Sequence, residues 1–356
     1  KLMQELRETC RKKELEHSSK KNRMDVDNIS KPGPQQWESH EAWYDDWAGH
    51  TTWGDLPGKG SGECDHGQGE QQRGHGEQEV DAIVWEAGIG GKLDATRVVP
   101  CRVAVVVQVT LEHTKLLGDS VLEIALDKCG IADDHIPLVL GPLPQDVLEA
   151  IREERNQRKA SMPLSLSPLA STDHVGLPGA HQKENARCAV TAARQLLADR
   201  FNPQKCAQAL MHARCPGRFE SLSHGSITVY VDAAHNESGL RSTLETLYSV
   251  EDRTVQPVII VGVSHDRPYQ RMIPLLTDTA LYTVCTEAQH KAARSETLAA
   301  FVDGPTYCTA SVSDALSVAL PLAEKEQVPL LITGGLFLAA EALWRLQGND
   351  PLELRF

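Results

Sequence analysis

The sequence predicts an α/β protein with parallel sheets in two folded domains. From Val80 onward, short apolar segments alternate with segments whose apolar residues have helical spacing, and this alternation is typical of a parallel sheet covered by helices. The chain has 356 residues, which is enough for two domains at about 150 residues each. Its hydrophobic content of 41% supplies enough apolar side chains for two cores.

The first part of the chain, residues 1–78, has a different composition and is predicted to be a low-order segment. Lys1–Arg23 has the charge pattern of a solvated helix, and Lys31–Gln36 is a Pro/Gly break. Gly58–Gly76 is rich in Gly, Gln, Glu and His and has almost no aliphatic residue. Such a segment buries too little apolar surface to offset the entropy cost of ordering, so we expect a loop or disorder there.

The next region, residues 79–214, is predicted to hold the first parallel sheet. Ala160–Gly179 is a Ser/Pro-rich connection before a long helix. From the length and spacing of the apolar runs we expect strands at Asp81–Trp85, Arg102–Val109 and Ile136–Leu140, and helices at Ser120–Cys129, Pro144–Arg158 and Lys183–Arg200.

The last region, residues 215–356, alternates more regularly and is predicted to be a Rossmann-like domain that begins near Arg214–Gly217. The expected strands are Ile227–Asp232, Val258–Val263, Leu281–Cys285 and Leu330–Thr333. The expected helices are Ser238–Val250, Tyr269–Thr277, Ser295–Phe301, Val312–Ala323 and Phe337–Gln347.

The charge and the cysteines exclude several classes of protein. A net charge of −13 argues against general binding to nucleic acid or to an anionic membrane, since both require a basic surface. The longest apolar stretches, such as Val103–Val107, are far shorter than the ~18 residues of a membrane helix. Nine cysteines without a CxxC pair predict reduced thiols and no zinc site. We therefore expect a cytoplasmic protein, with a mitochondrial location as the alternative.

Three motifs follow one another after the predicted strands. Glu86–Thr96 has the sequence Glu-Ala-Gly-Ile-Gly-Gly-Lys-Leu-Asp-Ala-Thr, and its glycines allow a close approach of backbone to a ligand. Leu111–Asp119 contains His113, and a neutral imidazole at a strand end can bind a divalent metal or a phosphate. Ile124–Ile131 contains Lys128 near a helix end. Taken singly, these motifs are more often a glycine turn, a structural histidine and a lysine that stabilises the helix dipole.

Taken together and in this order, the three motifs resemble those of the folylpolyglutamate synthase and dihydrofolate synthase branch of the Mur ligase family. That family has a Glu-Val-Gly-Leu-Gly-Gly-Arg-Leu-Asp-Ala-Thr stretch, then an Asp-His-Thr stretch, then a Glu-Lys-Ala-Gly-Ile stretch. The resemblance covers roughly residues 79–356 and rests on several independent motifs. Later segments that also resemble family motifs are Gly176–Asn185, Cys215–Glu220, Val231–Gly239, Gly262–Asp266 and Ile332–Leu336.

The resemblance implies an ATP-dependent amide ligase. Residues 79–214 would form a truncated Mur-ligase-type ATPase domain with a parallel sheet, and residues 215–356 the Rossmann-like C-terminal domain. ATP would phosphorylate a carboxylate, and the amino group of L-glutamate would attack the acyl phosphate to form an amide. The implied substrates are ATP, L-glutamate and a folate, or dihydropteroate instead of the folate. The implied state is a monomer without nucleic-acid or membrane partners.

The resemblance also assigns Mg²⁺ as the metal of the site. Glu86, His113 and Ser61 would bind the ion directly or through water. Lys128 is similar to the lysine that is carbamylated in the family, and a carbamate supplies the oxygen ligands that Mg²⁺ prefers. Lys128, His113 and Arg218 are accordingly the expected catalytic residues.

Four further residues are implied to contact ATP from the second half of the chain. Asn185 would face the adenine and Arg218 would contact the phosphates. Asp232, at the end of a strand, would bind the ribose or the adenine edge, and His235 would lie near the phosphates.

The candidate phosphate loop departs from the family pattern. The family has Gly-Thr-Asn-Gly-Lys-Gly-Ser, and Gly58–Ser61 matches only the last four residues of it. Trp47–Trp53 is a poor strand before the loop, and only 26 residues separate Lys59 from Glu86. Two interpretations stay open: Lys59 and Ser61 form a relocated phosphate loop, or the match is accidental.

Three alternatives to folate polyglutamylation follow from the sequence. The first is dihydrofolate synthesis by the same chemistry. The second is a catalytically impaired homologue that binds nucleotide or substrate only. The third is an NAD-dependent oxidoreductase, but Gly88-Ile-Gly-Gly does not have the GxGxxG spacing that this class requires.

Overall fold

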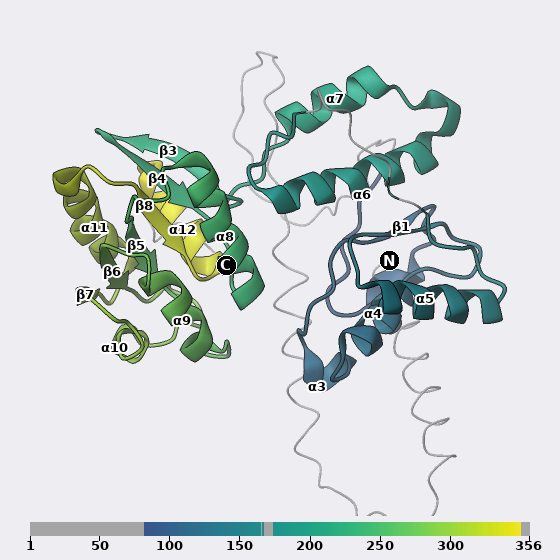
Figure 1. Cartoon of the computed structure of the whole chain (residues 1–356), viewed down its shortest axis with the longest axis horizontal. Coiled ribbons are helices and arrows are strands. Elements are labelled where there is room, and N and C mark those ends of the chain that lie inside the picture. Colours follow the sequence, from purple (N-terminus) through teal and green to yellow (C-terminus); the bar gives the residue numbers. More distant parts are fainter. Residues whose placement is uncertain (1–81, 165, 167–173, 350–356) are drawn as a thin grey trace, which may run out of the picture. The chain divides into compact units, whose positions relative to one another are not determined.

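The computed structural model describes residues 82–164, 166 and 174–349 (Figure 1). The described residues up to Pro100 belong to one unit and those from Cys101 onward to a second, and each unit is described by itself. The predicted low-order segment 1–78, with Lys59 and Ser61, lies outside the described residues. The division into residues 79–214 and 215–356 stays a prediction.

The described part of the first unit is a loop followed by one short helical turn. Ile83, Val84 and Trp85 are 67%, 100% and 54% exposed and have no regular secondary structure. The prediction of a strand at Asp81–Trp85 is therefore wrong over its described residues. A strand requires a neighbouring strand for its hydrogen bonds, and residues 82–100 contain none. The helical turn, a 3-10 helix, is at Ala95–Val98.

The second unit begins with a small parallel sheet. Strand β1 (Ala104–Val106) pairs with β2 (Leu138–Leu140), and the register places Val105 opposite Val139. Both strands were predicted, but they are shorter than expected because only three residues of each form the ladder. Gly141 follows β2 where a Cβ would lie 1.7 Å from the carbonyl oxygen of Val107, so only glycine fits there.

Three helices accompany the small sheet. The short α3 (Thr114–Leu117) was not predicted, whereas α4 (Val121–Cys129) and α5 (Gln145–Gln157) were. A capping box starts α4: Ser120 Oγ accepts from the Glu123 amide, and the Glu123 carboxylate accepts from the Ser120 amide. Apolar side chains of both long helices are buried against the sheet, and the largest of them are Ile124, Val147 and Ile151.

A helical hairpin follows. Its first helix is α6 (Ala180–Leu197), and its second is α7 (Pro203–His212), which was not predicted. Asn202 caps α7 by accepting from the Lys205 amide at 2.9 Å, and Pro203 occupies the first turn, where its missing N–H costs nothing.

The rest of the chain forms a six-stranded sheet with the order β3-β4-β8-β5-β6-β7. All neighbouring pairs are parallel except β3–β4. Four of the strands were predicted, and the two edge strands β3 and β7 were not because they are short or polar. The strands are β3 (Glu220–His224), β4 (Ile227–Val231), β5 (Val258–Val261), β6 (Tyr282–Cys285), β7 (Thr306–Cys308) and β8 (Leu330–Thr333).

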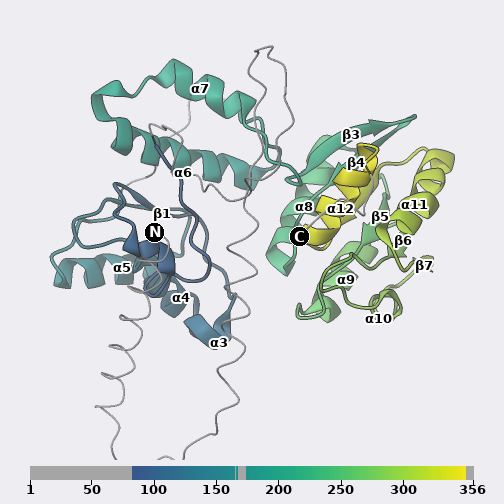
Figure 2. The same ribbon diagram turned by 180° about the vertical axis from the view of Figure 1, so that it is seen from behind.

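Helices cover both faces of this sheet (Figures 1 and 2). Alternate residues of the central strand β5 point to opposite faces: Val258 and Ile260 pack with one core, and Ile259 and Val261 with the other. The predicted Rossmann-like arrangement of helix, sheet and helix is thereby confirmed. One face carries α8 (Glu237–Val250), α9 (Tyr269–Thr277) and α10 (Ser295–Ala299), and the other carries α11 (Val312–Glu326) and α12 (Leu336–Leu346).

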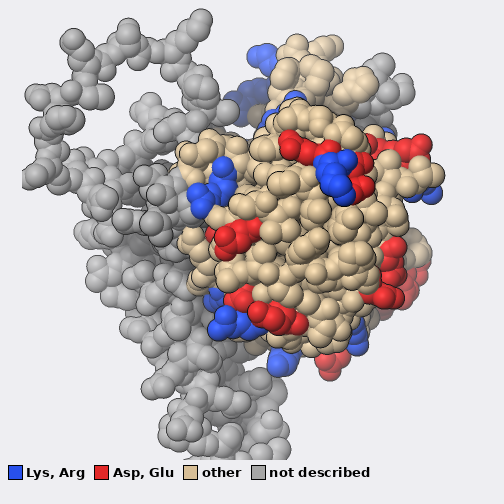
Figure 3. Space-filling model, turned by 90° about the vertical axis from the view of Figure 1, so that its left-hand side faces the viewer, with Lys and Arg blue, Asp and Glu red and all other residues tan. Residues whose placement is uncertain are grey.

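Two properties of the surface are relevant to partners. On the face that Figure 3 shows, acidic and basic side chains are interspersed among uncharged ones, so the negative net charge is not gathered there in one patch. None of the helices in the described part of the chain is long and apolar enough to cross a membrane.

Candidate functional site

The candidate site starts where parallel strands of the six-stranded sheet end. The neighbouring strands β4, β8 and β5 lead into Asp232–Asn236, Gly334–Gly335 and Gly262–Asp266. The first segment continues the ladder, since the Asp232 amide donates to the Ile332 carbonyl at 3.0 Å. In open α/β sheets ligands bind at this edge, so the sheet itself brings these motifs to a site.

Asp232 is directed into the protein. The residue is 9% exposed, and its Oδ1 accepts from the Ala234 amide at 2.9 Å and from Thr243 Oγ1 at 2.7 Å. Oδ2 accepts from the Phe219 amide at 2.9 Å. Both oxygens thus bind groups of the protein, which the sequence did not indicate for a residue expected at the ribose.

Arg218 lies in a tight turn between the helical hairpin and β3. Gly217 has φ 66° and Phe219 has φ 49°, so left-handed residues precede and follow the arginine. The Gly217 amide donates to Glu220 Oε2 at 3.0 Å. The side chain of Arg218 is exposed, and among the described residues no carboxylate forms an ion pair with it. The turn therefore presents an available guanidinium.

His235 and Asn236 connect the end of β4 with α8. Asn236 Oδ1 caps the helix by accepting from the Gly239 amide at 2.7 Å. Its Nδ2 donates to a carboxylate oxygen of Glu112, which immediately precedes His113 in the chain. The half-buried His235 has Nδ1 3.2 Å from the Ala233 carbonyl oxygen. The contact with Glu112 brings a motif of the small-sheet region to the end of β4.

His113 has an unusual conformation and environment. It is the residue before α3, with φ 52°. Burial lowers the pKa of His113, Glu112 opposes this shift, and the positive charges of Arg267 and Lys128 lower the pKa further together with His235. The imidazole is therefore neutral at pH 7, the form that can bind a metal or accept a hydrogen bond.

Lys128 and Arg267 supply the positive charge near His113. Lys128 is half-buried in the last turn of α4 and takes part in no ion pair within the described part of the chain. Arg267 was not among the residues singled out from the sequence. The available signal was its position directly after Gly262–Asp266, which leaves the carboxyl end of β5.

The start of α6 provides a second group. Burial lowers the pKa of His181, the negative charge of Asp232 raises it and the positive charge of Arg218 lowers it. This histidine therefore interacts electrostatically with Asp232 at the end of β4 and with Arg218 in the turn. Asn185, one helical turn later, donates from Nδ2 to Gln182 Oε1 at 2.9 Å. His181 is a site residue that the sequence did not single out, although it lies in the motif that includes Asn185.

Glu86 belongs to the separate first unit. Its side chain is exposed, on a glycine loop that Asp94 organises. Asp94 Oδ2 accepts from the amides of Gly88 and Ile89 at 2.9 Å and 3.1 Å, and Oδ1 accepts from the Thr96 amide at 2.9 Å. The motif thus folds as a loop that is fixed by its own aspartate.

The structure brings only some of the predicted site residues together. The structure brings His113, Lys128 and His235 together with Arg267, and Arg218 and Asp232 together with His181. Glu86 is in the other unit, and Lys59 and Ser61 lie outside the described residues. No group of three or more His, Cys, Asp or Glu side chains within residues 82–164 and 174–349 is arranged to hold a metal on its own.

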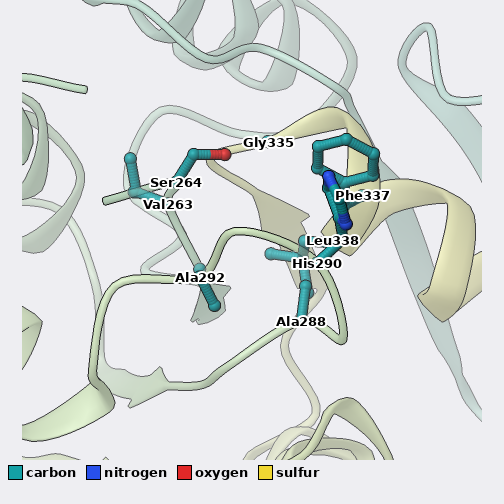
Figure 4. A pocket seen from close by; sticks show the side chains of 9 residues that line it. Val263, Ser264, Ala288, His290, Ala292, Gly335, Phe337 and Leu338 are labelled. Atoms are coloured by element: carbon teal, nitrogen blue, oxygen red, sulfur yellow. The ribbon is translucent and has the colours of Figure 1, made fainter. Parts of the chain in front are cut away.

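A small hollow lies at the same edge of the sheet, between the segments after β5 and β6 and the start of α12 (Figure 4). Its lining includes Gly262, His290, Gly335 and Phe337, and the rings of His290 and Phe337 meet edge to face at 4.5 Å. Its volume of about 10 Å³ has room for one water molecule, so it is a detail of the packing and not a ligand site.

The comparison with known families agrees with this arrangement. Residues 217–335 match the model of the Mur ligase, glutamate ligase domain. The chain therefore carries a domain of the Mur ligase family. The relatives and solved structures that it resembles are folylpolyglutamate synthases and dihydrofolate synthases.

Among curated proteins, this chain is 30% identical over 293 residues to a probable bifunctional folylpolyglutamate synthase/dihydropteroate synthase of Halobacterium salinarum, covering 75% of the chain and 35% of that protein. It is 28% identical over 299 residues to the folylpolyglutamate synthase of Lacticaseibacillus casei, covering 76% of the chain and 68% of that protein. The chain spans about a third of the length of the first relative.

Among solved structures, the chain is similar to folylpolyglutamate synthase of Mycobacterium tuberculosis complexed with ADP and AMPPCP. The TM-score is 0.64 at 25% sequence identity, with 74% of this chain and 68% of that chain covered. The apo form of the Lacticaseibacillus casei enzyme gives a TM-score of 0.61 at 25% identity, with 76% and 67% covered. The fold of the Mur ligase branch is therefore common to all three.

Proposed function

We propose that this chain is an ATP-dependent amide ligase that adds L-glutamate to a folate through an acyl-phosphate intermediate. The observation that carries the proposal is the meeting of His113, Lys128, His235 and Arg267 at the strand ends of a Mur ligase fold. Two proteins that match about three quarters of this chain are named folylpolyglutamate synthases, and the structure of one of them was solved with ADP and AMPPCP.

Positive charge is the main requirement of the first step. When a carboxylate attacks the γ-phosphorus of ATP, negative charge spreads over the phosphoryl oxygens and fixed cations stabilise it. The exposed guanidinium of Arg218 and the cation Arg267 are the groups of this chain that suit that role. The amine of L-glutamate then attacks the acyl carbon, an amide bond forms, phosphate leaves with the bonding electrons, and the amine loses its proton.

The residues near His113 also fit a divalent metal. A histidine with a lowered pKa has a free lone pair at pH 7, and Lys128 has no described carboxylate partner, so its amine is available to carry a carbamate. We propose that His113 and carbamylated Lys128 hold Mg²⁺. The bound ion would neutralise charge on the phosphate oxygens.

The nucleotide would lie along the second group of residues. Asn185 on α6 would face the adenine, and His235 and Arg218 would lie near the phosphates. The position of His181 beside Arg218 and Asp232 supports this assignment.

The function is tested with the purified chain, ATP, Mg²⁺, L-glutamate and tetrahydrofolate. We expect ADP release that depends on both substrates, and a product heavier by one glutamate residue in mass spectrometry. Lys128→Ala should lower the rate by about 100-fold because it removes a metal ligand. Lys205→Ala, at an exposed position of α7, is the matched control and should keep the wild-type rate. Equal rates for the two variants would contradict the role of Lys128.

The same assay separates the alternatives. Turnover of dihydropteroate in place of tetrahydrofolate would identify a dihydrofolate synthase. Binding of ATP without turnover of either substrate would identify a catalytically impaired homologue, which the two-stranded small sheet and the exposed Glu86 favour as the second candidate. We further propose a monomer with small-molecule partners, cytoplasmic or mitochondrial, and light scattering of the purified chain tests the monomer.

A further inference from the structure

Glu341 places a carboxylate on the buried side of α12. The residue is 2% exposed and lies beside the buried residues Leu338 and Ala342 of the same helix. A charged group in such a position is unfavourable unless hydrogen bonds replace the water that it loses. Burial raises the pKa of Glu341, and its hydrogen bonds with Gln289 and the positive charge of Arg345 lower it. No step of the proposed ligation uses this carboxylate, so its presence requires another explanation.

Glu341 bonds to a loop outside its own helix. Its Oε2 accepts from the Gln289 amide at 3.1 Å, and the two residues are 52 apart in the sequence. Gln289 belongs to the β6 loop, residues 287–294, which connects β6 with α10. A second fixed point of the β6 loop is Glu287, whose Oε1 accepts from the Ser295 amide at 3.2 Å. The β6 loop is therefore restrained both by its own glutamate and by a glutamate of α12.

The β6 loop pairs in turn with the segment that follows β5. The His265 amide donates to the Lys291 carbonyl at 2.9 Å. Next to this bond, Ser264 forms an antiparallel bridge with Ala292 (Figure 4). Lys291 has φ 52°, a left-handed conformation that persists only where the surroundings stabilise it. The position of the β6 loop is thus transmitted by backbone contacts to the segment after β5.

That segment leads to Arg267, one of the cations of the proposed site. The Arg267 amide donates to the Ser264 carbonyl at 3.0 Å, so the turn that carries Arg267 begins at a residue paired with the β6 loop. Burial lowers the pKa of His113, and the positive charge of Arg267 lowers it further, so the two side chains interact electrostatically. A shift of the β6 loop would therefore move Arg267 relative to His113.

We propose that Glu341 is a positioning residue, which holds the β6 loop and thereby keeps Arg267 beside His113. Each link from the α12 carboxylate through the β6 loop to the turn before Arg267 is a contact present in the structure. The catalytic part rests on the proposed function, which assigns Arg267 to the charge on the phosphoryl oxygens. In this role Glu341 acts through the backbone of other residues and does not touch the substrates.

The test compares Glu341→Met with Glu341→Gln in the steady-state assay with ATP, L-glutamate and tetrahydrofolate. Met fills a similar volume but is at most a weak acceptor, whereas Gln keeps one acceptor oxygen for the Gln289 amide. An apolar side chain in place of a buried charge is often neutral or stabilising, so Glu341→Met should keep the thermal midpoint. We expect its kcat to fall about tenfold with the KM for ATP unchanged, because a displaced cation weakens the stabilisation of charge that develops in the transition state. Glu341→Gln should keep the wild-type kcat.

Three further variants control the test. In the double variant of Glu341→Met with Arg267→Ala, the loss should not exceed that of Arg267→Ala alone. Leu316→Ala on α11 removes a buried side chain without removing a hydrogen bond of the β6 loop, and should lower the thermal midpoint but not kcat. If Glu341→Met does not fold, Gln289→Pro removes the same hydrogen bond from its exposed end and should lower kcat in the same way.

A wild-type kcat in Glu341→Met would overturn the proposal. Equal losses in Glu341→Met and Glu341→Gln would overturn it as well, because the charge and not the hydrogen bond would then matter, and so would losses that multiply in the double variant. If the wild-type chain shows no turnover, the proposed function fails, and hydrogen exchange of the His265 and Arg267 amides then decides about Glu341. Faster exchange in Glu341→Met than in Glu341→Gln supports the positioning, and equal exchange refutes it.

Discussion

The two sheets of the second unit differ in how completely they are built. The six-stranded sheet has a fully buried central strand, with helices on both faces and two separate cores. The small sheet has two strands of three residues, and Val105 in its β1 is 38% exposed. Both regions supply site residues, but only the larger has a core that surrounds its strands. Since stability depends on buried apolar surface, we expect the small sheet to open first.

The largest difference between the two sheets is expected from a matched pair of substitutions in their cores. Leu138→Ala in β2 and Leu331→Ala in β8 each remove a fully buried side chain, at a cost of about 3 kcal/mol. We expect Leu138→Ala to abolish hydrogen-exchange protection of β1 and β2 while the six-stranded sheet keeps its own. Leu331→Ala should lower the thermal midpoint of the large sheet but leave it folded. Protection of β1 and β2 that survives Leu138→Ala would contradict the difference.

A smaller effect is expected from two equivalent helix caps. Ser120→Ala removes the cap of α4, beside the small sheet, and Ser311→Ala removes the cap of α11, on the large one. Each should cost about 1 kcal/mol because one backbone N–H loses its acceptor. In chemical denaturation followed by circular dichroism, we expect equal losses of stability, but only Ser120→Ala should disturb the position of Lys128 and lower the rate of the proposed ligation. An unchanged rate would show that α4 is fixed by packing alone.

The smallest effect concerns pH. The folded-state pKa of His113 lies below its ordinary value, so the unfolded chain binds more protons than the folded chain as the pH falls through that range. His113 therefore contributes stability above about pH 6.5, and this contribution is lost as the pH falls from there through the lower folded-state value. His113→Gln should reduce the loss of stability between pH 7.5 and 5.5, measured by urea unfolding. His224→Gln, at an exposed position of β3, should leave the loss as in the wild type.

Much of the fold was predictable because the central strands are apolar and regularly spaced. Ile227–Val231 and Leu330–Thr333 satisfy the pattern of buried parallel strands, and both were found. The edge strand Glu220–His224 is polar and forms only by pairing with its neighbour, so composition alone did not indicate it. The prediction at Asp81–Trp85 fails for the opposite reason: the described residues Ala82–Trp85 are apolar, but a strand also depends on a partner that sequence periodicity does not reveal.

The site was predictable where motif order was informative and not where the fold had to bring residues together. His113, Lys128 and Asp232 were identified from their motifs. Arg267 and His181 lie in or beside such motifs, but only the structure places them against His113 and Asp232. The inward direction of the Asp232 carboxylate was also beyond the sequence, since an aspartate at a strand end has the same spacing whether it binds a ligand or a loop.

Asn236 gives the molecule a form of thermodynamic linkage. The Asn236 side chain both caps α8 and bonds to Glu112. The stability of the first turn of that helix is therefore coupled to the position of the His113 segment. Whatever draws Glu112 away leaves an amide donor without its acceptor at the start of α8. By reciprocity, whatever orders that turn also favours the bound position of the segment, and by the same amount.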